Sequence, residues 1–130
     1  MSKKAIDIPE ASITIRKDGI LHINIKVRSH YELEQMNRVM EARAKITKGK
    51  AYPILHTVTA NIIPSEEILE HIAKSDRSSV SLADAFVIRS LTHRLLIAEY
   101  MQLSQSSKVP LQFFSSEAKA IEWLKEFVES

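Results

Sequence analysis

The chain has 130 residues, of which 45% are hydrophobic and 26% are charged, and its formal net charge at pH 7 is +2. This composition is typical of one globular domain over residues 1–130, and the near balance of charges gives no support for nucleic-acid binding. The absence of cysteine excludes disulfides, thiolate catalysis and cysteine-ligated metals, while the short apolar runs predict neither a membrane span nor a signal peptide, so we expect a cytoplasmic protein.

Two segments near the start of the chain alternate apolar and polar residues, as half-buried strands do. They cover residues 12–16 and 20–27. Lys17-Asp18-Gly19 between them supplies the Asp-Gly pair that tight hairpin turns favour. We therefore expect the chain to open with an antiparallel hairpin.

A capping box predicts the first helix. Ser29 and Glu32 have the S-x-x-E spacing of this motif. Gly49 is typical of the residue that ends a helix. We expect the helix from about Tyr31 to Thr47. The apolar residues at helical spacing that support it are Leu33, Met36, Met40 and Ala44.

The rest of the chain alternates strands with helices. Apolar runs at 51–58, 80–88 and 111–114 predict buried strands. Ser65, followed by two glutamates, is typical of a residue that caps the second helix. The third helix is expected over residues 91–103, and Ser115 or Ser116 caps the fourth. The residues that this last helix is expected to turn inward are Ala120, Ile121, Leu124 and Phe127.

These elements give the order ββαβαβαβα and an α/β fold. Strands that alternate with helices need crossover connections, and such connections place the strands parallel and are right-handed. The expected architecture is a mixed sheet that opens with an antiparallel hairpin and continues with parallel strands and crossover helices.

Several segments of the chain from Tyr52 onward carry a family resemblance. They are Tyr52-Pro53-Ile54-Leu55, Ala83 with Ala85-Phe86-Val87-Ile88, Arg94-Leu95, Lys108-Val109-Pro110, Phe113-Phe114-Ser115-Ser116-Glu117 and Ile121-Glu122-Trp123-Leu124. In this order they resemble small bacterial domains of the sporulation anti-anti-sigma type, the STAS-like group often labelled SpoIIAA-like, which is related to the CRAL-TRIO lipid-binding fold. The resemblance implies a regulatory domain that binds a protein partner, or a module that binds a lipid-like ligand.

The resemblance also implies a phosphorylation switch, because the STAS family carries a serine at the start of the helix after the third strand. Ser65 occupies that place, but Pro64, Glu66 and Glu67 replace the Asp-Ser-Ser-Gly context. Two acids beside the hydroxyl would repel an added phosphate. We expect Ser65 to act as a helix cap, with the switch as the weaker alternative.

No motif for cofactor chemistry is present. Gly19 and Gly49 are the only glycines, so a phosphate-binding loop of the P-loop or dinucleotide type cannot be built. The five histidines show no ligand pairing for a metal, and there is no G-x-S-x-G nucleophile motif. We expect no cofactor, no nucleotide, no metal and no catalysis.

Polar residues gather where two of the predicted parallel strands end, which is where ligands bind in open α/β sheets. They are His56, Arg89, Ser90 and His93. An anion or polar ligand is one reading, and the alternative is that Ser90 caps the helix while the charged side chains face solvent. Asp84 lies inside a strand otherwise suited to burial. It either pairs with His56 or a nearby arginine, or its strand lies at the sheet edge.

The third helix carries two apolar stripes. One contains Leu91, Leu95, Ala98 and Met101, and the other contains Leu96, Tyr100 and Leu103. One stripe packs on the sheet, and the second is either covered within the monomer or left for a partner. The candidate partner surface is Leu96, Tyr100 and Leu103, with a protein partner or a second copy of the chain as its occupant.

The sequence therefore predicts a non-enzymatic regulatory or protein-interaction domain of STAS/SpoIIAA-like type. The alternative is a binding module for a small apolar or lipid-like ligand, and an enzyme ranks third. The two leading functions differ in whether the second stripe of the third helix forms a flat interface or lines an enclosed cavity.

Overall fold

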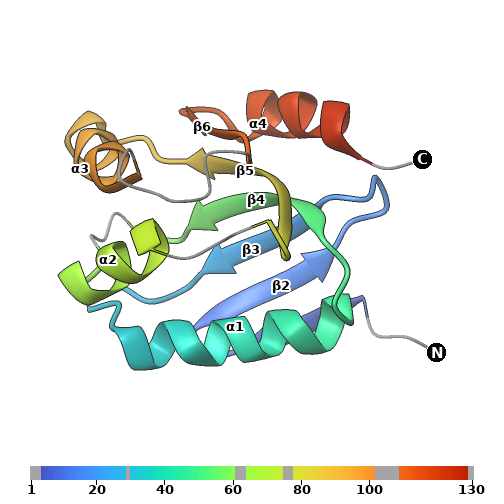
Figure 1. The fold of residues 1–130 in the computed structure, drawn as a ribbon, viewed down its shortest axis with the longest axis horizontal. Helices are drawn as coiled ribbons and strands as arrows, with labels where there is room; N and C mark the ends of the chain where they lie inside the picture. Colours follow the sequence, from blue (N-terminus) through green and yellow to red (C-terminus); the bar gives the residue numbers. More distant parts are fainter. Residues whose placement is uncertain (1–3, 29, 61–63, 75–77, 102–108, 129–130) are drawn as a thin grey trace.

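The computed structural model describes residues 4–28, 30–60, 64–74, 78–101 and 109–128. Within these residues, a six-stranded sheet is flanked by helices (Figure 1). The strands are β1 (Ala5–Ile8), β2 (Ala11–Ile15), β3 (Leu21–Ile25), β4 (Tyr52–Val58), β5 (Ser81–Val87) and β6 (Leu111–Phe114). The helices are α1 (Leu33–Thr47), α2 (Glu66–Lys74), α3 (Leu91–Met101) and α4 (Glu117–Leu124), and α4 continues into the 3₁₀ turn η1 (Lys125–Phe127).

The strands lie side by side in the order of the chain. β1, β2 and β3 are antiparallel, whereas β3, β4, β5 and β6 are parallel, which confirms the predicted mixed sheet with an antiparallel start. Right-handed crossovers between sequential neighbours place α1, α2 and α3 on one face of the sheet. Helix α4 follows the last strand and packs on the opposite side of β4 and β5.

The predicted hairpin is the β2–β3 pair, but the sheet begins one strand earlier. β1 pairs antiparallel with β2 through Ile6↔Ile13 and Ile8↔Ala11. Its four residues alternate exposed and half-buried positions, and only two isoleucines mark it in the sequence. A strand this short has too few residues for a periodic signal. The observed order is therefore βββαβαβαβα.

Helix α1 begins two residues later than predicted. Its N-cap is Glu32, whose side chain accepts from the backbone of Gln35 while the Gln35 side chain accepts from the Glu32 N–H at 2.8 Å. The capping box thus involves Glu32 and Gln35; Ser29 lies outside the described residues. Ala44 is exposed, because the buried stripe runs through Val39, Ala42 and Ile46 on a face rotated away from it. The helix ends at Thr47 as predicted.

Two apolar layers hold the helices to the sheet. On the α1 side, Ile13, Ile23 and Ile54 pack against Val39, Ala42 and Ile46. On the α4 side, Leu55, Ala83 and Ala85 are fully buried against Ala120 and Leu124. These are two of the four inward residues predicted for the last helix, and the other two, Ile121 and Phe127, are partly buried against the same cluster. Successive residues of β4 and β5 point to opposite faces, so each strand contributes to both layers.

Among the helices in the described residues, none has the length and apolar character needed to cross a membrane.

Candidate functional site

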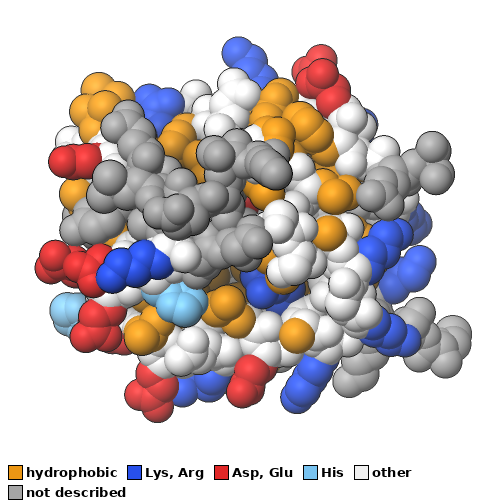
Figure 2. Space-filling view, viewed as in Figure 1, with side chains coloured by type: hydrophobic (Ala, Val, Ile, Leu, Met, Phe, Trp, Pro, Cys, Tyr) orange, Lys and Arg blue, Asp and Glu red, His pale blue; other side chains and the backbone are white. Residues whose placement is uncertain are grey.

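A cavity of about 510 Å³ lies between the sheet and helices α1, α2 and α3. This volume falls within the roughly 300–1,000 Å³ of typical small-molecule sites. In the space-filling view most of the charged side chains of the described residues lie around the outline of the molecule, and apolar side chains are exposed between them (Figure 2). The apolar residues that line the cavity are Ile23, Ile25, Tyr31, Met36, Val39, Met40, Ile54, Val58, Pro64, Ile68, Leu69, Val80, Phe86, Val87, Ile88 and Ile97.

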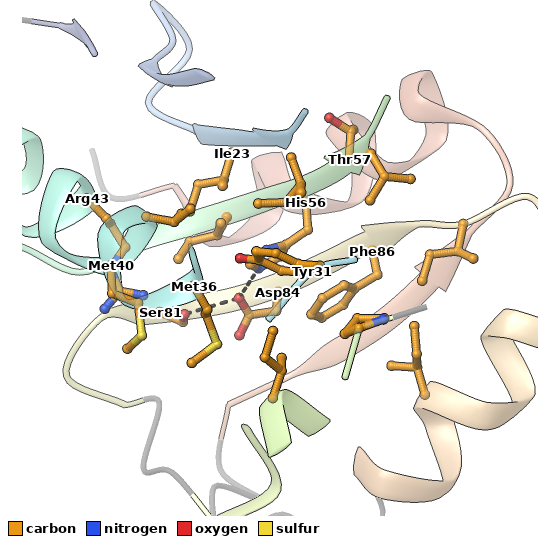
Figure 3. A pocket seen from close by; sticks show the side chains of 18 of the residues that line it. Ile23, Tyr31, Met36, Met40, Arg43, His56, Thr57, Ser81, Asp84 and Phe86 are labelled. Atoms are coloured by element: carbon orange, nitrogen blue, oxygen red, sulfur yellow. Dashed lines mark hydrogen bonds and ion pairs between the residues drawn. The ribbon is translucent and has the colours of Figure 1, made fainter. Parts of the chain in front are cut away.

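A hydrogen-bonded cluster interrupts this apolar lining (Figure 3). His56 Nε2 lies 2.7 Å from Asp84 Oδ1, and Ser81 Oγ donates to the same oxygen at 3.1 Å. Asp84 is 2% exposed. An ionised carboxylate can only accept, so the tautomer of His56 that carries its proton on Nε2 is the one that satisfies an ionised Asp84. The three side chains satisfy one another in a setting where an unpaired carboxylate would be costly.

The register of the sheet builds this cluster. His56 of β4 pairs with Phe86 of β5, and their rings stack at 4.2 Å between centroids and 6° between planes. Asp84 stands two residues before Phe86, so it points to the same face, diagonally across from His56. At the start of β5 the register shifts by one residue, since Tyr52 pairs with Ser81 and Pro53 pairs with Ala83. This bulge re-aims the Ser81 side chain toward Asp84.

Helix α1 supplies a cation to the same cavity. Met36, Met40 and Arg43 follow one another at helical spacing, so Arg43 extends the stripe that faces the sheet. Figure 3 shows Arg43 beside Met40 and Ser81, at the opposite end of the view from Phe86. Arg43 forms no hydrogen bond or ion pair with any residue that the structure describes.

Burial changes the acid–base behaviour of two groups that line the cavity. Desolvation lowers the pKa of the Arg43 guanidinium, and the negative charge of Asp84 opposes that shift. Removal from water also raises the pKa of the Tyr31 hydroxyl, with a smaller contribution in the same direction from Glu10. Tyr31 therefore stays neutral at physiological pH, and Arg43 stays charged because an arginine pKa begins far above 7.

Of the four residues predicted to form a polar site, two line the cavity and two do not. His56 and His93 both line the cavity. Ser90 caps α3, accepting from the His93 N–H at 3.3 Å, and Arg89 is exposed. The sequence left two possibilities for Asp84, a contact with His56 or an arginine, or a place on an edge strand. The structure shows the first, because Asp84 contacts His56 and its strand, β5, lies between β4 and β6.

The candidate partner surface lies only partly within the described residues. Leu96 is half-buried, Leu103 lies outside them, and the side chain of Tyr100 is not described. On the same helix, Leu91 and Leu95 are 60% and 63% exposed, and both belong to the other predicted stripe.

Ser65 stands at the start of α2, and its Oγ accepts from the Ile68 N–H at 3.3 Å. Ser116 does the same for α4, where its Oγ accepts from the Lys119 N–H at 3.4 Å. Both serines thus make the contact of a helix cap.

Sequence reasoning missed three groups of the cavity, namely Tyr31, Arg43 and Ser81. The spacing of Arg43 from Met36 and Met40 was a usable signal, since it places the cation on the apolar stripe. Ser81 gave no signal, because its direction depends on a bulge in strand pairing.

The fold has a counterpart among solved structures. It is similar to the crystal structure, at 2.25 Å resolution, of an uncharacterised protein of the DUF3478 family with a SpoIIAA-like fold from Shewanella loihica PV-4. The TM-score is 0.56 at 11% sequence identity, over 88% of this chain and 91% of that one. This likeness confirms the predicted SpoIIAA-like fold and carries no function.

Sequence comparison places the chain in a family. No protein with a curated description matches it. Residues 13–128 match the family described as a domain of unknown function, DUF7793. The match spans almost the whole chain, and the protein belongs to the DUF7793 family.

Proposed function

We propose that this chain is a non-enzymatic binding domain that holds one small, predominantly apolar molecule between the sheet and α1, α2 and α3. The cavity of about 510 Å³ and its mostly apolar lining carry the proposal. Small-molecule sites in proteins share this volume and this combination of an apolar wall with a few placed polar groups. Among the two functions that the sequence favoured, this was the alternative reading.

The physical drive for binding is the removal of apolar surface from water. Burial contributes about 0.8 kcal/mol for each CH₂ group that a ligand places against the apolar lining. Met36 and Met40 suit such a role, because unbranched, polarizable side chains adapt to ligands of different shape. A ligand with a short hydrocarbon body therefore gains most of its affinity from the lining.

The polar cluster supports binding over nucleophilic catalysis. A serine nucleophile needs a base within reach of its hydroxyl, as in Ser–His pairs. Here the Ser81 hydroxyl donates to Asp84 at 3.1 Å, and His56 donates to the same carboxylate. Both donors are directed to Asp84, so the imidazole is not positioned to take the serine proton.

Native mass spectrometry of protein purified from its host tests the proposal. We expect a species heavier than the polypeptide by the mass of one small molecule, which is released when the protein is denatured. Val39→Phe, which places a larger side chain at the cavity wall, should abolish the heavier species.

Ala44→Phe is the matched control, because Ala44 is exposed on the same helix, and this variant should keep the ligand. Far-UV circular dichroism establishes that both variants fold. The bare polypeptide mass for the wild type, together with no change in melting temperature on adding N-phenyl-1-naphthylamine, a neutral apolar probe, would overturn the proposal.

A second function, contact with a protein partner through α3, is favoured by one observation. Leu91 and Leu95 are both more than half exposed and lie one helical turn apart, so they form a small apolar patch. Sedimentation equilibrium tests whether the partner is a second copy. If Leu95→Ser abolishes self-association and Leu96→Ser keeps it, the contact lies at the patch of Leu91 and Leu95. The reverse result places the contact at the predicted partner surface that contains Leu96. A wild-type protein that stays monomeric at all concentrations excludes self-association.

A further inference from the structure

Arg43 is the one described residue of the cavity wall whose charge has no partner in direct contact. Its side chain lies beside Met40 and Ser81 among the residues that line the cavity (Figure 3). Two other arginines form ion pairs, Arg38 with Glu10 at 2.7 Å and Arg16 with Asp18 at 2.9 Å. A cation left without a partner in an apolar wall is costly unless something neutralises it.

Asp84 does not serve as that partner. Its Oδ1 accepts from His56 and Ser81, and no ion pair joins it to Arg43. Asp84 is also the only acidic residue among the described residues that line the cavity, which otherwise contribute histidines and neutral groups. The described part of the wall therefore provides a carboxylate that accepts two hydrogen bonds and a guanidinium that forms no hydrogen bond or ion pair with a described residue.

We infer that the ligand of the cavity is an amphiphilic anion, with one acidic head group bound by Arg43 and an apolar body directed toward Phe86. This inference rests on the proposed function and names the chemical class of its ligand. Guanidinium groups bind carboxylates and phosphates through paired N–H donors, and such charge-assisted hydrogen bonds are the stronger kind.

The geometry orients the ligand along the cavity. Arg43 and Ser81 lie at one end in Figure 3, and Phe86 lies at the other, with Met36 and Asp84 between them. At the Phe86 end, Leu69, Ile88 and Ile97 form a buried apolar cluster. Tyr31, labelled beside Asp84 in Figure 3, also lines the cavity, and its hydroxyl forms no hydrogen bond within the described residues, so it offers a bound ligand a neutral donor.

Three probes of equal chain length and different head group test this inference. Decanoate, decanol and decylammonium are each titrated at neutral pH, below the concentration at which they form micelles, against protein loaded with N-phenyl-1-naphthylamine. Displacement lowers the probe fluorescence. We expect decanoate to bind about tenfold more tightly than decanol, which is the effect of one charge-assisted hydrogen bond. Decylammonium should bind most weakly.

Arg43→Met separates the head-group contact from the rest of the cavity. It keeps an unbranched side chain at the wall, so N-phenyl-1-naphthylamine should still bind, but the preference for decanoate over decanol should fall to within about twofold. Lys45→Met is the matched control, because it removes one cation from the exposed side of the same helix and should keep the preference.

The outcomes distinguish the two proposals. If neither N-phenyl-1-naphthylamine nor any of the three probes binds, the cavity is not a ligand site and both proposals fail. If the neutral probes bind but decanoate shows no preference over decanol, or if Arg43→Met retains that preference, only the anionic head group is excluded. Tightest binding of decylammonium would assign the head-group contact to Asp84 and overturn the inference. Inorganic phosphate, titrated separately, should displace no probe, since it lacks an apolar body.

Discussion

The two faces of the sheet are packed in different ways. On the α4 face a single helix closes the layer, and small side chains at Ala83, Ala85 and Ala120 let it approach β5 closely, with Leu55 and Leu124 fully buried beside them. On the opposite face three helices are available, yet a cavity of about 510 Å³ remains beneath them. The amount of covering structure therefore does not decide how densely a face is packed.

The polar groups follow the same division. The cavity wall holds the ionisable groups Arg43, His56 and Asp84, whereas the side chains buried under α4 form an apolar cluster with the hydrogen-bonded pair His22 and Thr57 beside it. Charged side chains in a protein interior and incompletely filled space are both expected at functional sites. We interpret the α4 face as the part that stabilises the fold and the α1–α3 face as the part that binds.

The largest expected effect is the loss of the α4 anchor. Leu124 is fully buried, so Leu124→Ala should lower the free energy of unfolding by about 2–5 kcal/mol, the usual cost of a large-to-small change in a packed core. Urea denaturation followed by circular dichroism measures it. A loss below about 1 kcal/mol would mean that this face is not densely packed.

A pair of enlarging substitutions compares the faces directly. Ala85→Leu, in the packed layer, should cost about 1–3 kcal/mol because the added carbons have no space. Val39→Leu adds one carbon at the cavity wall and should change stability by less than about 1 kcal/mol. The same denaturation experiment measures both. Equal costs for the two variants would contradict the difference in packing.

The helix caps on the two faces form another matched pair. Ser65→Ala and Ser116→Ala should each lower stability by about 1 kcal/mol, because each removes an acceptor from a helix N-terminus. Only Ser65→Ala should also weaken binding of N-phenyl-1-naphthylamine, since α2 supplies Ile68 and Leu69 to the cavity.

Ser65→Asp, itself a good cap, should be nearly neutral for stability and for binding. Phosphoserine at this position in cells, or loss of binding in Ser65→Asp at an unchanged melting temperature, would instead support the phosphorylation switch implied by the family resemblance.

The smallest effect concerns pH. Burial lowers the pKa of His22, which contacts Thr57 at 2.7 Å on the face of α4. The unfolded chain thus binds a proton at a higher pH than the folded chain does, so stability is full above the unfolded pKa of about 6.5 and falls as the pH drops toward the folded value.

His22→Gln removes this titration. The fall in urea midpoint between about pH 7.5 and pH 5.5 should therefore be smaller in the variant than in the wild type. An identical fall in both proteins would show that His22 does not contribute.

The sequence predicted most of the fold because its signals are local. The spacing in α1, the Asp-Gly turn and the last strand, Leu111–Phe114, were read from neighbouring residues, and right-handed crossovers then restrict the topology. The strand Ala5–Ile8 was missed because four residues hold too little periodicity. Ala44 was placed on the buried stripe of α1, although the buried face of the helix is rotated away from it and Ala44 is exposed.

The candidate site was less predictable, because it depends on distances between elements. His56 and Asp84 were considered as a pair, and the structure joins them at 2.7 Å. Arg43 was not considered, since a charged residue on a helix is usually assigned to solvent. The cavity itself has no local sequence signature, because its lining comes from strands and helices that are far apart in the sequence.

Methyl NMR of protein labelled with ¹³C at its isoleucine methyl groups tests the central claim most directly, with N-phenyl-1-naphthylamine as the titrant. The binding account predicts shifts for isoleucines of the cavity, Ile23, Ile54, Ile68 and Ile97, and none for Ile20 and Ile121, which pack in the α4 layer. Shifts confined to Ile20 and Ile121, or no shift at saturating probe, would contradict the assignment of ligand binding to the α1–α3 face.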